Sequence, residues 1–191
     1  MDPKYVVDPA NETDTTSLSN CGELQPDNLA IVWKLDFDKR TLAGSAEYTF
    51  SKIGSGVTKV CFDNSALDIT GVEVDGKKTD WKVHAPHKAL GSKLEVGLVP
   101  GSGTKNKDTR VKIFYSTAPT ASAIQWADAA ATADKKRPYV YTQCQAIHAR
   151  SLMPCMDSPG IKMSYTAEVT APEWCTVLMS ALGDGDKVNK D

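Results

Sequence analysis

Apolar and polar residues alternate along much of the chain, and this period of two is typical of β-strands with one buried face. Trp33, Leu35 and Phe37 share one face of the first run, while charged residues occupy the other face. After the polar Asp38-Lys39-Arg40 stretch, residues 42–50 return with the same alternation. The two runs therefore predict a β-hairpin.

The same pattern continues toward the C-terminus. Apolar residues at Val57, Val60 and Phe62 indicate another strand, and Asp75-Gly76 suits the positive φ angles of a tight hairpin turn. Residues 93–116 predict two strands separated by a glycine-rich loop, and the alternation resumes over residues 161–172. Short strands separated by frequent turns indicate an all-β fold, a sandwich or saddle of mixed, mainly antiparallel sheets.

Helical periodicity is nearly absent. Residues 125–136 are the best helical candidate, with room for one or two turns before Pro138. Residues 1–28 are polar and contain three prolines, so we expect a flexible N-terminal arm. The β domain is expected to span residues 29–182, followed by a loose tail at residues 183–191.

Composition narrows the classes of partner. The chain has 191 residues, a net charge of -2 and a pI near 5.9, so we expect neither nucleic acid nor a membrane as partner. No run approaches the roughly 20 apolar residues of a membrane-spanning helix. The five cysteines are odd in number and scattered, and no signal peptide opens the sequence, which predicts reduced thiols in the cytoplasm.

Residues 141–159, YTQCQAIHARSLMPCMDSP, carry the densest candidate chemistry. If Cys144 and His148 met, they would form a thiolate–imidazole pair, but the extended local sequence favours a buried, unreactive thiol. Cys144, His148 and Cys155 fit no common zinc spacing, and no glutamate separates His84 from His87.

Two glutamines and an ion pair complete this stretch. In an extended segment Gln143 and Gln145 face the same side, where their amides would either grip a substrate's α-ammonium or simply be hydrated. Arg150 and Asp157 could pair across the turn at Pro154 and hold its shape, or remain separate surface charges.

Several blocks then resemble one enzyme family. They are LDFDKRTLAG (35–44), SAIQW (122–126), RPYVYTQCQAIHAR (137–150), MPCMDSP (153–159) and YTAEVTAP (165–172). Together they resemble the zinc aminopeptidases of the leukotriene-A(4) hydrolase and aminopeptidase B type, within the aminopeptidase N superfamily. The resemblance runs from about residue 16 to about residue 184.

The resemblance implies a saddle-shaped N-terminal domain that sits over a separate zinc-bearing catalytic domain. Gln145 matches the glutamine that holds the peptide's free α-amino group, Gln143 lies beside it, and Cys144 falls between them. The family's His-Glu-x-x-His zinc motif and Gly-x-Met-Glu-Asn segment are absent from this sequence. We therefore expect no catalytic residue and no metal ligand in the chain, and no activity from the chain alone.

A second reading concerns the C-terminal end. In the family, residues equivalent to 180–181 are followed by further strands of the same domain, so we expect this chain to be a fragment or truncated isoform. Without those strands, residues 175–182 would form an apolar edge strand. The alternative function is therefore a β-sandwich interaction module that self-associates through this edge.

Overall fold

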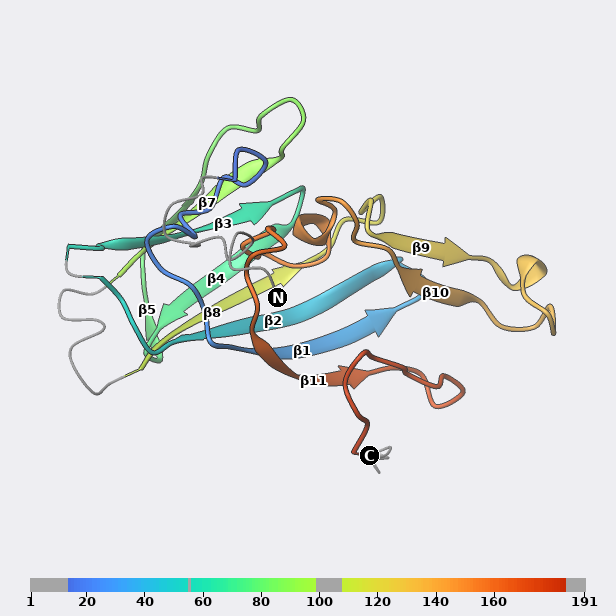
Figure 1. Cartoon of the computed structure of the whole chain (residues 1–191). Helices are drawn as coiled ribbons and strands as arrows, with labels where there is room; N and C mark the ends of the chain where they lie inside the picture. Colours follow the sequence, from blue (N-terminus) through green and yellow to red (C-terminus); the bar gives the residue numbers. More distant parts are fainter. Residues whose placement is uncertain (1–13, 55, 99–107, 185–191) are drawn as a thin grey trace, which may run out of the picture.

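The structure is a computed structural model that describes residues 14–54, 56–98 and 108–184. Within these ranges it contains strands in three sheets and short 3-10 turns, so the all-β expectation is confirmed (Figure 1). No helix in the described ranges is both long and apolar enough to cross a membrane. The strands are β1 (Asn28–Asp36), β2 (Thr41–Phe50), β3 (Lys59–Asn64), β4 (Asp68–Val74), β5 (Lys77–Lys78), β6 (Trp81–Val83), β7 (Ser92–Gly97), β8 (Thr109–Ser116), β9 (Ile124–Ala127), β10 (Tyr139–Thr142) and β11 (Ser164–Thr170).

The largest sheet has six strands in the order β11-β1-β2-β8-β4-β5. The predicted first hairpin is confirmed, because β1 and β2 pair antiparallel from Asn28↔Thr49 to Asp36↔Thr41. Gly44 is required at the centre of this hairpin, since a Cβ there would collide with the carbonyl oxygen of Val32. β11 pairs parallel to the other side of β1, which makes the sheet mixed.

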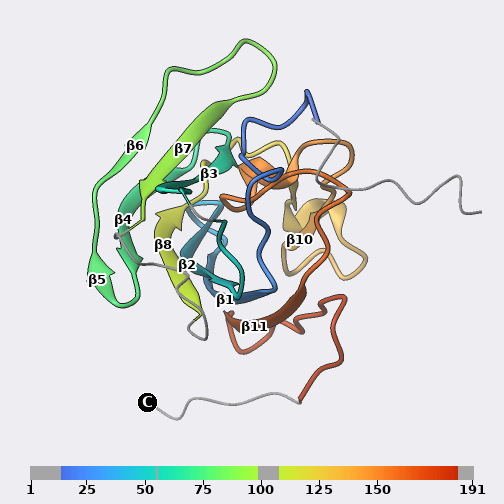
Figure 2. The same cartoon turned by 60° about the vertical axis from the view of Figure 1, so that its left-hand side comes forward.

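The second predicted hairpin is also confirmed at its turn. Asp75 and Gly76 both have positive φ angles, 49° and 75°, and they join β4 to β5. The run after Gly76 is not one strand, however. β5 ends at Lys78 in the large sheet, and β6 crosses to a three-stranded sheet of order β3-β7-β6. The passage of the chain from β5 to β6 can be followed in Figure 2. At this point the Gly97 amide donates to the Asp80 carbonyl over 3.2 Å.

The core fills the space enclosed by these sheets, because each strand buries alternate side chains. Tyr48 and Phe62 lie against each other with ring centroids 4.9 Å apart, and both are fully buried. A buried hydrogen bond of 2.7 Å from the Trp33 indole to the Tyr115 hydroxyl ties β1 to β8 across the same core. The core also includes Phe50, Val60, Val74, Leu94, Val96, Val111 and Ile113.

The helical candidate, residues 125–136, forms one helical turn in the connection between two strands. Gln125 and Trp126 lie in β9, and one 3-10 turn at Ala129–Ala131 is the helical structure found there. β9 and β10 pair with each other and project from the end of the large sheet (Figure 1). The first residues of the candidate are extended and not helical because the Trp126 ring packs edge-on against Phe37, with centroids 5.6 Å apart.

The N-terminal arm differs in its second half from the expectation of flexibility. Residues 1–13 lie outside the described ranges, but residues 14–27 pack against the domain. Leu24 is buried in the core, and the Leu18 amide donates to the Asp63 carboxylate over 2.6 Å. This segment therefore covers the outer edge of β3.

Candidate functional site

The candidate residues Gln143, Cys144 and Gln145 follow directly on β10. The Gln143 amide donates to the Ala123 carbonyl over 2.8 Å, which extends the pairing of β10 with β9 by one residue. The extended run then ends and a turn begins at Gln145, so the strand geometry expected for the three residues holds only for its first part. Both glutamines are exposed, and Cys144 is half-buried between them.

The two amides are not equivalent. The Gln143 Oε1 atom accepts a hydrogen bond from the Gln145 backbone amide at 3.3 Å. The Gln145 carboxamide has no partner in the part of the chain that the structure describes, so its oxygen and both N–H groups are open to a ligand. Gln145 is therefore the freer acceptor, and Gln143 shapes the backbone beside it.

Cys144 does not form the thiolate–imidazole pair that was weighed from the sequence. Burial raises the pKa of the Cys144 thiol, and the negative charge of Asp157 raises it further, so the thiol form is favoured. The His148 imidazole contacts the Ser122 hydroxyl instead, with 2.6 Å between Nδ1 and Oγ. His148 meets Cys144 only through the backbone, where its amide donates to the Cys144 carbonyl over 2.9 Å.

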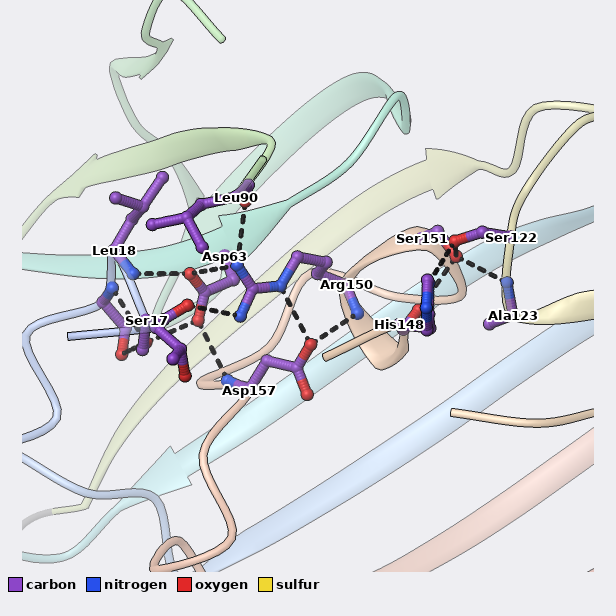
Figure 3. Close-up of polar contacts among 12 residues, drawn as sticks. Ser17, Leu18, Asp63, Leu90, Ser122, Ala123, His148, Arg150, Ser151 and Asp157 are labelled. Carbon is purple, nitrogen blue, oxygen red and sulfur yellow. Dashed lines mark hydrogen bonds and ion pairs between the residues drawn. The ribbon is translucent and has the colours of Figure 1, made fainter. Parts of the chain in front are cut away.

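Two serines secure this turn against β9, and the sequence offered no signal for their role. The Ser151 hydroxyl donates to the His148 carbonyl at 2.8 Å and accepts from the Ala123 amide at 2.9 Å. Ser122 lies within reach of both Ser151 and the His148 ring (Figure 3). The network therefore fastens both ends of the glutamine-bearing turn, because Ala123 also holds Gln143.

Arg150 anchors the C-terminal side of the same loop. Its side chain is only 3% exposed, and its Nε donates to the Asp157 carboxylate at 2.9 Å. Of the two alternatives that the sequence left open for Arg150 and Asp157, the structure supports the pair, and the contact is buried. The remaining guanidinium nitrogens donate to the carbonyl oxygens of Leu90 and Thr16 at 2.8 and 2.9 Å.

Asp63 completes this buried cluster and was missed in the sequence. It is fully buried on β3, and it lies 3.5 Å from the Arg150 guanidinium (Figure 3). Its carboxylate also accepts from the Ser17 hydroxyl at 2.6 Å and from the Asp157 amide at 3.0 Å. One carboxylate therefore joins the N-terminal segment, β3 and the loop that follows the glutamines.

The described residues do not fit a zinc site. They contain no group of three histidine, cysteine, aspartate or glutamate side chains placed to hold a metal ion. His84 lies 3.4 Å from Glu95, a carboxylate shared with Lys59, and the His87 ring accepts from the backbone amide of Ala89. We therefore assign no metal ligand within residues 14–54, 56–98 and 108–184.

Comparison with known proteins identifies the family. Residues 25–189 match the family described as Peptidase M1 N-terminal domain. Among curated proteins, the chain is 40% identical over 158 residues to leucine aminopeptidase 2 of Yarrowia lipolytica, covering 83% of this chain and 24% of that protein. It is 34% identical over 173 residues to leukotriene A-4 hydrolase of Xenopus laevis, covering 91% of this chain and 28% of the relative.

Solved structures show the same relationship. The fold matches yeast LTA4 hydrolase in complex with bestatin with a TM-score of 0.76 and 30% identity, over 85% of this chain and 25% of that one. A two-domain M1 zinc metallopeptidase bound to L-arginine shares the fold at 15% identity, with a TM-score of 0.56, 78% of this chain and 32% of that chain. The chain thus spans about a quarter of the length of the curated relatives. With the sequence match, the mixed-sheet fold and the chain's length in agreement, this protein belongs to the peptidase M1 family as an N-terminal domain.

Proposed function

We propose that this domain forms one wall of the substrate cleft in a zinc aminopeptidase of the leukotriene A4 hydrolase type. In this role Gln145 accepts a hydrogen bond from the peptide's α-ammonium group, and Gln143 supports it. The observation that carries the proposal is the open Gln145 carboxamide on a turn whose two ends are fastened to the fold. The proposed reaction class, aminopeptidase activity of the whole enzyme, is supported by the relatives named leucine aminopeptidase 2 and leukotriene A-4 hydrolase.

A neutral amide suits this task. Its oxygen accepts a charge-assisted hydrogen bond from an ammonium, but the amide carries no charge of its own that must be desolvated when the substrate binds. Cys144 adds a half-buried surface between the two amides, and its raised thiol pKa keeps it neutral. The set therefore holds and orients the amine but transfers no proton and breaks no bond.

The zinc of such an enzyme, and the partner domain that carries it, belong to the proposal for the whole protein. The described residues offer no ligand set for zinc, so the proposed part of this domain is to bind and orient the substrate. We propose the cytoplasm as the location, in agreement with five cysteines that are all free thiols.

Binding of the amine can be tested on the isolated chain by NMR. Leucine amide should shift the side-chain NH₂ signals of Gln145, whereas N-acetyl-leucine amide, which lacks the ammonium, should not. In a Gln145→Leu variant the backbone amide signals of Gln143 and Cys144 should no longer shift on addition of leucine amide, as they do in the parent chain, and Gln25→Leu, ahead of β1, serves as the matched control. Equal shifts with both ligands would show that the amides do not recognise an amine.

Catalysis by the chain alone is a separate measurement. Hydrolysis of leucine p-nitroanilide by the purified chain should not exceed the buffer rate. Turnover that a zinc chelator abolishes would contradict the proposal that this domain binds the substrate but does not cleave it.

A second function, self-association, is supported by one exposed segment. Leu178 and Leu182 are 87% and 99% exposed, which is unusual for leucine. Their segment is not the edge strand expected from the sequence, since no strand follows Thr170 within the described residues. The edge is β11, whose outer side is unpaired in the described structure. Light scattering should show a mass that rises with concentration, and a constant monomer mass would exclude this function.

A further inference from the structure

A pair of stacked tyrosines lies in line with the candidate amides. Tyr139 and Tyr141 alternate along β10, so they project from the same face. Their ring centroids are 5.9 Å apart with planes inclined by 30°, and the residues are 58% and 50% exposed. Gln143 is the next residue on this face, because its backbone continues the pairing of β10 with β9.

The neighbouring strand leaves room beside these rings. Gln125 is the register partner of Tyr141, and the small Ala127 is the partner of Tyr139. The Gln125 side chain is held by donation to the Ser122 carbonyl at 3.2 Å, which leaves its oxygen free to accept. The outer face of the hairpin therefore presents two stacked aromatic rings with amide groups beside them.

The opposite face of the hairpin already has its partner. There the Trp126 ring packs against Phe37, which in turn lies 5.0 Å from Trp174. The tyrosines are thus not needed to hold the hairpin on the domain. Neither phenol oxygen makes a hydrogen bond to another described residue, and tyrosine is a residue type enriched at binding surfaces because it offers apolar area and a polar tip at low entropy cost.

We propose that Tyr139 and Tyr141 form an aromatic subsite for an extended peptide whose amine is held at Gln145. The inference rests on the proposed function and specifies its substrate class. Because strands rise about 3.3 Å per residue, the four residues from Gln145 back to Tyr141 span up to about 13 Å, and an extended peptide has the same repeat. The fifth residue of the peptide therefore meets Tyr141, and an aromatic side chain there packs against its ring.

The exposed rings of Tyr139 and Tyr141 favour an aromatic peptide side chain over a small one. Aromatic pairs favour offset or edge-on packing, which adds to the area that any apolar group would bury. Gln125 supplies an acceptor for a backbone amide of the bound peptide. We expect the pentapeptide Ala-Ala-Ala-Ala-Phe to bind about fivefold more tightly than Ala-Ala-Ala-Ala-Ala, as one additional aromatic contact would give.

Titrations of the isotope-labelled chain with these two pentapeptides, followed by NMR, test the subsite. The variant Tyr139→Ser/Tyr141→Ser should bind both peptides equally, whereas Tyr139→Phe/Tyr141→Phe should keep the preference because it keeps the rings. Melting temperatures of the two variants close to that of the parent chain verify that the exposed substitutions leave the fold intact.

The outcomes separate this inference from the proposal beneath it. Equal binding of the two peptides by the parent chain, or no binding of either up to its solubility limit, overturns the aromatic subsite. If the N-acetylated peptides keep both the affinity and the phenylalanine preference of the free peptides, the amine-binding role of Gln145 fails but the subsite stands. If sedimentation finds a dimer that the serine variant dissociates, the rings bind a second copy of the chain, and the substrate role is wrong.

Discussion

Replacement of Arg150 by methionine should destabilise the domain more than any single surface change. Methionine has comparable length and fills most of the volume, but it cannot donate to Asp157 or to the carbonyls of Leu90 and Thr16. Two carboxylates, those of Asp63 and Asp157, would then face each other with side chains only 0% and 10% exposed.

The size of the effect follows from this burial. Removal of one partner from a buried ion pair costs about 3 to 5 kcal/mol, because the remaining charge stays desolvated and unpaired. Domains are typically stable by about 5 to 15 kcal/mol, so the variant should lose a large share of its stability. At about 2 to 4 °C per kcal/mol for a chain of this size, the melting temperature should fall by roughly 6 to 20 °C.

Urea unfolding followed by circular dichroism measures the loss. Arg40→Met is the matched control, since Arg40 also bonds a carboxylate, Asp128, at 2.6 Å, but the two side chains are 47% and 76% exposed. That exposed pair should contribute less than about 1 kcal/mol. Arg150→Lys keeps the charge but not the planar fork of donors, so its stability should fall between those of the parent and Arg150→Met.

The comparison of the two arginines can refute the reasoning. Equal losses for Arg150→Met and Arg40→Met would show that the buried cluster contributes no more than a surface pair. A more stable Arg150→Met variant would mean that the desolvation of the three charged groups outweighs their mutual attraction.

Three further changes probe separate parts of the domain. Tyr48→Phe removes the buried hydrogen bond of 2.5 Å to the Pro154 carbonyl and should cost about 1 to 3 kcal/mol in urea unfolding; an unchanged midpoint would count against that bond. Cys144 should react with iodoacetamide at pH 7 more slowly than a free thiol, because burial raises its pKa, and a faster rate would reinstate an activated thiolate. The hydrogen bond from Lys59 lowers the pKa of Glu95, so this carboxylate stabilises the fold above pH 4.5 and the increment is lost as the pH falls further. Unfolding midpoints of Glu95→Gln should accordingly fall less between pH 6 and pH 3 than those of the parent chain, and parallel curves would contradict the assignment.

Local sequence was sufficient for the strands and their turns. Alternation over β1 and β2 identified the buried faces, since a period of two depends only on neighbouring residues. The Asp75-Gly76 turn was predictable for the same reason, because its positive φ angles are a local demand. The Arg150–Asp157 pair was also within reach, because its members are only seven positions apart in the sequence.

The sequence misled where a local propensity met a tertiary partner. The alanines after Trp126 do form one 3-10 turn, but packing of the half-buried Trp126 against Phe37 keeps the residues before them in the strand β9. Residues 14–27 were polar enough to suggest a free arm, yet Leu24 enters the core and Leu18 bonds Asp63.

Periodicity and turn chemistry in the amino-acid order therefore specify an all-β chain with defined hairpins, and they place one glutamine on either side of Cys144. The folded arrangement decides the rest: the parallel placement of β11 beside β1, the transfer of β6 to a second sheet, and the burial of Asp63 beside Arg150. These features join segments as far apart as 136 residues, and their energies arise from desolvation and hydrogen bonds that exist only when the segments meet. No local pattern can report such an energy, because the same aspartate in the same sequence context would be a hydrated surface charge if β3 lay elsewhere.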